Sequence, residues 1–288
     1  MTVVAPPGTV CAIDIGGTKL AAAIVATNGT VLRQPRGPTP TDGDAELLFA
    51  TLVGLVDAVD PEGTSAIGVG CGGPMTAGGK LVSPLNIPAW RNFPLHDRLA
   101  ERFGVPVRID NDAKALALGE GWLGAARGVP DYIGMVVSTG IGGGIVCDGR
   151  LLDGADGNAG HIGHVVVEPD GRPCPCGARG CVEAEASGTA IAAMTGRPAA
   201  EAGDDVIART GTLVGRAVAS VANLLDLRLA VVSGSVALGY GDPFFAAAQA
   251  EIDLRCRLDF SRGTRIVPGA LGADGPLIGA AAVALRRN

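Results

Sequence analysis

Residues 10–31, VCAIDIGGTKLAAAIVATNGTV, set the pattern of the fold. An apolar run over Val10–Asp14 ends at a pair of glycines, and a second apolar run over Leu20–Ala26 is closed by Asn28-Gly29, a dipeptide typical of tight hairpin turns. A third run begins at Val31. The stretch therefore predicts three strands joined by tight turns, which form a meander at the edge of a larger sheet.

Strands and helices alternate along the rest of the chain. Apolar residues at helical spacing predict a helix over 44–59, and a short apolar run predicts a buried strand over 66–69. The other predicted elements are a strand over 105–109, a helix over 113–122, strands over 132–137 and 145–146, a helix over 213–227, a strand over 229–232 and a closing helix over 277–286, with loops over 35–41 and 197–205. Because strand, glycine turn and strand recur at 132–146, the pattern predicts an α/β fold with two similar lobes.

Length and composition favour the same fold class and exclude others. The 288 residues, 47% of them hydrophobic, exceed the usual size of one domain, so we expect two lobes with a central cleft. A net charge of −6 without a concentrated basic face argues against nucleic acid as a partner. The 45 glycines are too many for a helical bundle and lack the period of collagen, so they mark turns.

The sequence carries no signal for export or membrane insertion. Residues 1–10 lack the basic and apolar regions of a secretory leader, and charged residues interrupt the apolar stretch 212–232. We therefore expect a cytoplasmic protein with no membrane partner. Four isolated cysteines suit reduced core residues in that compartment: Cys11, Cys71, Cys147 and Cys256.

Residues 160–183, GHIGHVVVEPDGRPCPCGARGCVE, contain a candidate metal site. One imidazole and three thiolates complete a closed tetrahedral zinc site, and here they are His164, Cys174, Cys176 and Cys181. The C-x-C-x4-C spacing is tight, but Gly177 and Gly180 can take the positive φ angles that it requires. Disulfides are the alternative. Zinc is favoured because three cysteines within eight residues cannot all pair with one another.

The first glycine turn, residues 14–19, is a candidate phosphate site. Backbone N–H groups in a glycine turn can approach phosphate oxygens without steric hindrance. Gly16 and Gly17 would form the turn, Thr18 and Lys19 would reach phosphate oxygens, and Asp14 would hold Mg²⁺ through water. The spacing is not that of a Walker A loop.

A second glycine turn, STGIGGG over 138–144, would close on the same nucleotide from the other lobe. Its expected nucleotide contacts are Thr139, Gly140, Gly142, Gly143 and Gly144. Gly234, which follows the late strand, would allow close approach of an adenosine. Each turn alone is also compatible with an ordinary hairpin or strand end, but one turn in each lobe favours phosphate binding.

Asp112 is the candidate catalytic base. It stands between a predicted strand and a predicted helix, where the helix N-terminus would keep its carboxylate ionised and ready to accept a proton from an attacking hydroxyl. The alternative is an ordinary helix N-cap. Asn111 and Asn86 add neutral groups of the kind that orient sugar hydroxyls, and the metal loop would direct His161 and Glu183 into the same cleft.

Taken together, these motifs resemble the ROK family (repressors, open reading frames and kinases) of the actin-like ATPase superfamily. The resemblance covers nearly the whole chain, through DIGGTK, NDAKALALGE, STGIGGG, AGHIGH, CPCGARGCVEAEASG, SGSVALG and LIGAAAVAL. It implies two RNase-H-like lobes of the actin and hexokinase type. The N-terminal lobe would be 1–112, joined by a C-terminal helix over 277–288, and the C-terminal lobe 113–276, with its zinc-stabilised loop at 160–183.

The resemblance also implies an activity. It predicts ATP and Mg²⁺ in the cleft, a structural zinc, and transfer of the γ-phosphate to a sugar 6-hydroxyl with Asp112 as base. Asn111, His164 and Glu183 would contact the sugar, so that His164 is both zinc ligand and substrate contact. Family members are often dimers, so a homodimer is expected.

Two positions depart from the common pattern of family glucokinases. His161 stands where many have Glu, and a neutral imidazole donates one hydrogen bond and accepts one, whereas a carboxylate only accepts. This His-x-x-His form resembles bacterial N-acetylmannosamine kinases, which makes N-acetylmannosamine the preferred substrate and a glucokinase the alternative. Lys114 stands where Asn or Gln is common, and we expect it on an exposed helix face.

Two further alternatives are not sugar kinases. A sugar-responsive repressor of the family carries an N-terminal winged helix-turn-helix, for which the residues before Asp14 leave no room. A non-catalytic sugar-sensing protein would keep the sugar and zinc sites. Replacing Asp112 by Asn separates it from an enzyme, because only an enzyme has turnover to lose.

Overall fold

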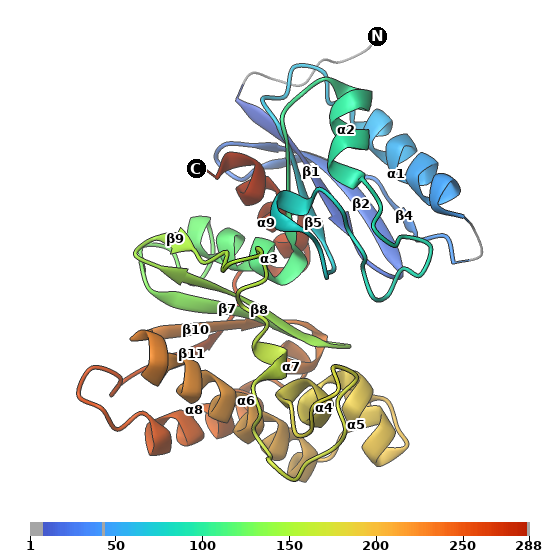
Figure 1. The fold of residues 1–288 in the computed structure, drawn as a ribbon. Coiled ribbons are helices and arrows are strands. Elements are labelled where there is room, and N and C mark those ends of the chain that lie inside the picture. The colour runs from blue at the N-terminus through green and yellow to red at the C-terminus, as the bar shows by residue number, and fades with distance from the viewer. Residues whose placement is uncertain (1–7, 42–43, 287–288) are drawn as a thin grey trace. The chain divides into compact units, whose positions relative to one another are not determined.

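The computed structural model describes residues 8–41 and 44–286, which form two compact units (Figure 1). Unit 1 comprises the described residues up to Leu123, the segment Asp153–Ala159 and the described residues from Leu271 onward, and unit 2 comprises Gly124–Leu152 and Gly160–Ala270. Residues 1–7, 42–43 and 287–288 lie outside the described residues. They include most of the N-terminal stretch that lacks the features of a leader and the last two residues of the expected C-terminal helix.

A mixed β-sheet forms the centre of unit 1, and it confirms the predicted meander. Its strands run in the order β3-β2-β1-β5-β6, with β4 also paired to β2. The meander β1-β2-β3 is antiparallel, whereas β1, β5 and β6 are parallel. The strands are β1 (Thr9–Ile15), β2 (Lys19–Ala26), β3 (Val31–Arg33), β4 (Arg36–Pro38), β5 (Ile67–Cys71) and β6 (Val107–Asn111).

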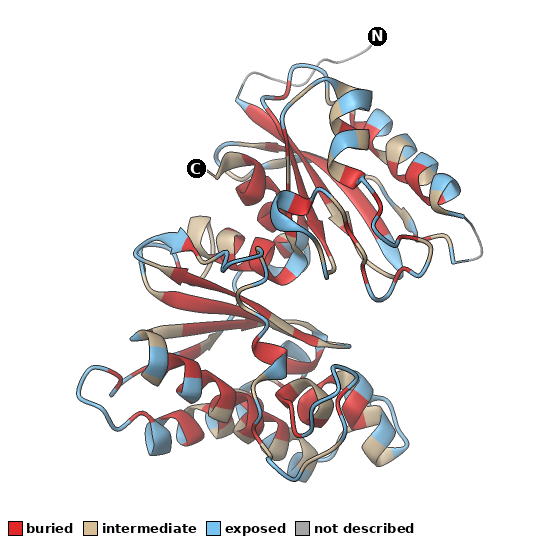
Figure 2. Cartoon of the chain, viewed as in Figure 1, coloured by how far each residue is buried: buried red, intermediate tan, exposed pale blue. Residues whose placement is uncertain are grey.

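Helices cover both faces of this sheet because side chains on its strands alternate between two cores. In β1, Cys11 and Ile13 pack with α1 and α2, while Val10 and Ala12 pack with α9. Figure 2 shows the resulting buried strands. The helices of unit 1 are α1 (Ala45–Val59), α2 (Leu95–Phe103), α3 (Asp112–Trp122) and α9 (Gly275–Leu285), with short 3-10 turns η1 (Ala77–Gly79) and η4 (Gly272–Asp274).

Unit 2 repeats the strand topology of unit 1. Its sheet has the order β11-β10-β7-β8-β9, in which β7, β8 and β9 form an antiparallel meander and β7, β10 and β11 are parallel. The elements are β7 (Tyr132–Val137), β8 (Ile141–Cys147), β9 (Arg150–Leu151), η2 (Ile162–His164), α4 (Val182–Ala186), α5 (Gly188–Thr195), η3 (Ala199–Glu201), α6 (Asp204–Leu225), β10 (Leu229–Ser233), α7 (Ser235–Tyr240), α8 (Asp242–Arg255) and β11 (Arg265–Pro268). The prediction of two similar α/β halves is therefore confirmed.

Three sequence predictions of local structure are wrong. The glycine turn expected to extend to Gly144 is confined to residues 138–140, because Gly142–Gly144 belong to β8 and pair with β7. The expected loop 35–41 contains β4. Helix α6 begins at Asp204 rather than 213, since Gly211, which reads as a helix breaker, instead allows close packing: a Cβ there would lie 2.4 Å from the carbonyl oxygen of Phe244.

None of the helices described is both long enough and apolar enough to cross a bilayer.

Candidate functional site

In unit 1, candidate residues gather at the carboxyl ends of three parallel strands, the edge at which open α/β sheets bind ligands. Strand pairing aligns Asp14 with Gly70 and Gly70 with Asp110, and the next position aligns Ile15, Cys71 and Asn111. The turn 16–18 follows β1 at this edge, and Asp112 begins α3 directly after β6. The topology thus brings Asp14, Asn111 and Asp112 together from segments almost 100 residues apart.

Asp14 is electrostatically linked to Asp112. Burial and, to a lesser extent, the negative charge of Asp112 raise the pKa of Asp14, while Lys19 and Arg36 lower it, and the net effect is a pKa raised to about 6. A bound cation would oppose the first two effects. A hard divalent ion that takes oxygen ligands therefore fits this pair of carboxylates.

The N-cap of α3 is Asn111 rather than Asp112. The Asn111 side chain accepts a hydrogen bond from the Ala113 N–H at 3.0 Å, and Asp112 is the first residue of the helix. An oxygen of the exposed Asp112 carboxylate accepts from the same N–H at 2.8 Å. The interpretation of Asp112 as an ordinary N-cap is therefore wrong, and its carboxylate lies at the positive end of the helix dipole.

The first glycine turn packs directly against the loop that carries Asn86. A Cβ on Gly17 would lie 2.7 Å from the Asn86 Cβ and 3.0 Å from its carbonyl oxygen, so no larger residue fits. On its other side the turn is held by Thr39, whose hydroxyl donates to the Gly16 carbonyl at 2.7 Å. Thr18 and Lys19 are exposed next to it.

Arg91 stabilises the Asn86 loop from within, a role that the sequence prediction missed. Its guanidinium donates to the carbonyl oxygens of Pro84, Ile87 and Trp90 at 3.0, 2.9 and 2.6 Å. An arginine close to a proline-rich turn is the only sequence signal for this contact.

In unit 2, the second glycine turn is held by the start of two helices. The Thr139 carbonyl accepts from the backbone N–H and the hydroxyl of Thr189, and the Ser138 hydroxyl lies 2.9 Å from that of Ser235. Between these two contacts, Gly234 has φ +102°, and a Cβ there would lie 2.4 Å from the Val137 carbonyl oxygen. Thr139, Gly140 and Gly234 are therefore brought together, as a shared nucleotide site requires.

Glu183 joins this turn to the metal loop. Its Oε2 accepts from the Ile141 N–H at 2.9 Å, directly after the turn. A Cβ on Gly163, in η2, would lie 3.4 Å from the Glu183 Cβ, so η2 packs against the same side chain. Exposed His161 precedes η2, and its ring centre lies 6.2 Å from that of His164. The structure thus gathers His161, His164 and Glu183 within unit 2.

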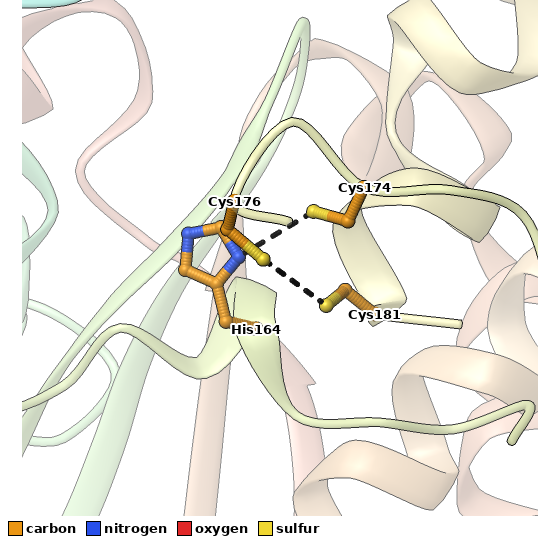
Figure 3. Close-up of side chains that lie close together, drawn as sticks. All are labelled: His164, Cys174, Cys176 and Cys181. Atoms are coloured by element: carbon orange, nitrogen blue, oxygen red, sulfur yellow. Dashed lines mark hydrogen bonds between the residues drawn. The ribbon is translucent and has the colours of Figure 1, made fainter. Parts of the chain in front are cut away.

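The four predicted zinc ligands form one cluster (Figure 3). All four ligand atoms lie within 4.8 Å of one another, with 3.8 Å between the sulfurs of Cys176 and Cys181 and 3.7 Å between His164 Nδ1 and the Cys174 sulfur. A tetrahedron with Zn–S bonds of about 2.3 Å and a Zn–N bond of about 2.0–2.1 Å has corresponding edges of about 3.8 and 3.6 Å. The residues therefore fit zinc, as both donor set and distances require.

Positive φ angles at two glycines of the metal loop are confirmed. Gly177 and Gly180 have φ of +95° and +68°.

Behind the loop, the buried carboxylate of Glu185 accepts hydrogen bonds from the backbone and side chain of Arg172 and from the side chain of Arg209. Burial raises the pKa of Glu185, but these hydrogen bonds outweigh it and lower the pKa overall. Sequence reasoning missed this support, whose partners are distant along the chain.

Lys114 is buried, so the prediction that it lies on an exposed helix face is wrong. Only 3% of its side chain is accessible, and its ammonium contacts Asp110 and Asp153 at 3.0 Å each. Both neighbours, Ala113 and Ala115, are buried as well. The first turns of α3 therefore have little exposed face on which a lysine could lie.

The chain is similar to known proteins over most of its length. The chain is 41% identical to a glucokinase of Thermotoga maritima over 182 residues, which are 62% of this chain and 57% of the relative. It is 39% identical to an N-acetylmannosamine kinase of Citrobacter koseri, over 80% of this chain and 84% of the relative. Among solved structures, a ROK family glucokinase from Streptomyces griseus in complex with glucose and AMPPNP has a TM-score of 0.82 at 30% identity, covering 96% of this chain and 99% of that one. Residues 10–287 match the model of the ROK family, and the chain belongs to that family.

Proposed function

We propose that this protein, a carbohydrate kinase of the ROK family, transfers the γ-phosphate of ATP to the 6-hydroxyl of an N-acylhexosamine, with N-acetylmannosamine as the preferred substrate. The observation that carries the proposal is the position of Asp112. Its carboxylate is exposed at the head of α3, beside Asn111 and within electrostatic reach of Asp14. Phosphoryl transfer to an alcohol needs a base, a group that orients the sugar and a carboxylate that holds magnesium, and unit 1 supplies all three.

In the proposed reaction, Asp112 accepts the proton of the sugar hydroxyl as that oxygen attacks the γ-phosphorus and ADP leaves. Asn111 and Asn86 orient the sugar, and Gly16, Gly17, Thr18 and Lys19 approach the phosphates. Asp14 would hold Mg²⁺ through water, and the ion would neutralise the charge of the phosphate oxygens. On the other unit, Thr139, Gly140 and Gly234 are the proposed nucleotide contacts, whereas Gly142, Gly143 and Gly144, which the sequence also suggested, belong to β8 and pair with β7.

The zinc would shape the sugar site without taking part in the chemistry. With His164 Nδ1 directed at the cysteines, its Nε2 is the ring nitrogen that can contact a substrate. His161 and Glu183 would complete the set. The His161 imidazole supplies both a donor and an acceptor, which suits the amide of an acetamido group better than a carboxylate does.

Location and assembly are part of the same proposal. None of the seven cysteines forms a disulfide, which fits a reducing compartment such as the cytoplasm. We propose a homodimer there, which size-exclusion chromatography with light scattering tests directly.

The deciding experiment measures ADP release with N-acetylmannosamine, glucose, N-acetylglucosamine, mannose and allose. N-Acetylmannosamine should give the highest kcat/KM, and His161→Glu should shift the ratio toward glucose. If glucose exceeds N-acetylmannosamine in the wild type, the substrate assignment fails and the glucokinase alternative, which the Thermotoga relative favours, replaces it.

Asp112→Asn tests the chemistry in the same assay. It should lower kcat by about 10²- to 10⁴-fold, the usual contribution of a general base, while sugar affinity measured by calorimetry stays within threefold. A variant that retains turnover contradicts the role of Asp112. A wild-type protein that binds sugar but releases no ADP would instead be the non-catalytic sensor.

A further inference from the structure

The buried ammonium of Lys114 occupies a site with three oxygen ligands. Its Nζ lies 3.0 Å from the Asp110 carboxylate, 3.0 Å from the Asp153 carboxylate and 3.0 Å from the Gly157 carbonyl. An ammonium has three donors, so these partners satisfy it completely. Burying a lysine is costly unless it is paired, and here the complete pairing offsets that cost.

A second cation completes the cluster. The Arg286 guanidinium lies 3.4 Å from the Asp110 carboxylate and 2.6 Å from that of Asp153. Two carboxylates therefore face two cations, and the group is neutral. Asp153 is half exposed and Asp110 is buried, but the Lys114 side chain is the least exposed of the three, at 3%. Water therefore screens the charge of Lys114 least.

Asp110 connects the cluster to the proposed sugar contacts of unit 1. The Asp110 Oδ1 that lies near Lys114 also accepts from the Asn111 N–H at 2.8 Å. Asn111 in turn caps α3, which begins with Asp112. Moving the Asp110 carboxylate would therefore move the Asn111 backbone.

Segment 153–159 connects the cluster to the proposed sugar contacts of the metal loop. Segment 153–159 belongs to unit 1, although the chain before and after it belongs to unit 2. Its contacts with Lys114 are made by Asp153 and Gly157, and His161 follows only two residues after its end. The position of segment 153–159 thus constrains where the chain enters the His161 turn.

We propose that Lys114 is a positioning residue for the sugar. Its ammonium fastens segment 153–159 to the junction of β6 and α3 at residues 110–112, and so sets the position at which the chain enters the His161 loop. The inference rests on the proposed function, because it takes Asn111 and His161 as sugar contacts. Nucleotide affinity should be little affected. The two glycine turns are held by other contacts, from Thr39 and Asn86 in unit 1 and from Glu183 and Thr189 in unit 2.

The test compares Lys114→Met, Lys114→Arg and Asp153→Asn with the exposed control Lys80→Met. Steady-state assays give separate KM values for sugar and ATP, and hydrogen exchange reports on peptides that span residues 153–161. We expect Lys114→Met and Asp153→Asn, which both break the Lys114–Asp153 contact, to raise the sugar KM by about tenfold, with the ATP KM and kcat within about twofold. Amides of 153–161 should exchange faster in both variants, Lys114→Arg should recover part of the loss, and Lys80→Met should match the wild type.

Equal changes in both KM values, or a fall in kcat alone, would show a merely structural role and overturn the proposal. Unchanged exchange over 153–161 in Asp153→Asn would overturn it even if Lys114→Met did not fold, since the exposed Asp153 tolerates the amide. A wild type without sugar-dependent ADP release refutes the proposed function instead, and hydrogen exchange then still decides whether Lys114 fastens the segment.

Discussion

Replacing Gly17 by alanine tests the contact between the first glycine turn and the Asn86 loop. The added Cβ would lie 2.7 Å from the Asn86 Cβ, and ordinary van der Waals contact begins at 3.4 Å. The turn and the loop must therefore separate by about 0.7 Å at this point. The second contact, 3.0 Å from the Asn86 carbonyl oxygen, prevents escape by side-chain rotation because it involves backbone.

The expected result is a large functional loss with a moderate loss of stability. Overpacking of this kind costs about 1–3 kcal/mol, which for a chain of this length lowers Tm by several degrees. A displacement approaching 1 Å between groups that orient substrate and phosphate lowers kcat/KM by about 10- to 100-fold. Coupled ADP-release kinetics and differential scanning calorimetry measure the two effects on the same preparation.

Gly54→Ala is the matched control. Gly54 lies inside α1, is exposed, and a Cβ there would meet nothing within 4 Å. Alanine should therefore stabilise the protein by about 0.5–1 kcal/mol without changing the kinetics. If Gly17→Ala keeps kcat/KM within threefold of the wild type, the close approach of the two loops has no role in catalysis and the reasoning is refuted.

Two further predictions concern charge and metal. Because the folded-state pKa of Asp14 is raised from 3.8 to about 6, the native state binds its proton more tightly than the unfolded state, so stability falls as pH rises through this window. Without Mg²⁺ and nucleotide, Asp14→Asn should therefore have a higher Tm than the wild type at pH 7.5 and the same Tm below about pH 4; a gain that is equal at both pH values would contradict this cause. Purified protein should contain about one equivalent of zinc per chain, and its chelation should lower Tm and raise the sugar KM, because the loop from His161 to Glu183 loses its anchor; elemental analysis well below one equivalent would count against the metal site.

Local patterns predict the three strands of the first meander, part of the β7-β8 hairpin and the residues of the His/Cys cluster, and the reason is physical. Short apolar runs and an Asn-Gly turn act over a few residues, and the three cysteines lie within eight positions. The same reasoning fails where the signal is not local. Helix α2 is absent from the sequence prediction. It has Pro94 at its N-cap and no side-chain cap, so its start carries none of the usual capping signals.

Lys114 shows the same limit within the candidate site. Its neighbours along α3 correctly predict a helix, but the helix is buried on more sides than one, and the carboxylate of Asp153 lies 39 positions along the chain. Glu185 with Arg209 is a similar case. Buried ion pairs depend on tertiary contacts, which spacing along the sequence does not encode.

The placement of α9 has a consequence for how the protein is made. Residues from both ends of the chain build unit 1, since Leu277, Ala280 and Ala284 cover one face of a sheet whose first strand begins at Thr9. A ribosome therefore has to synthesise residues 275–285 before that face of the sheet can be covered. Until then β1 and β2 remain open to non-native association, and a stop codon just before Gly275 would release a polypeptide that has every proposed reactive group but lacks the helix that covers this face of the sheet.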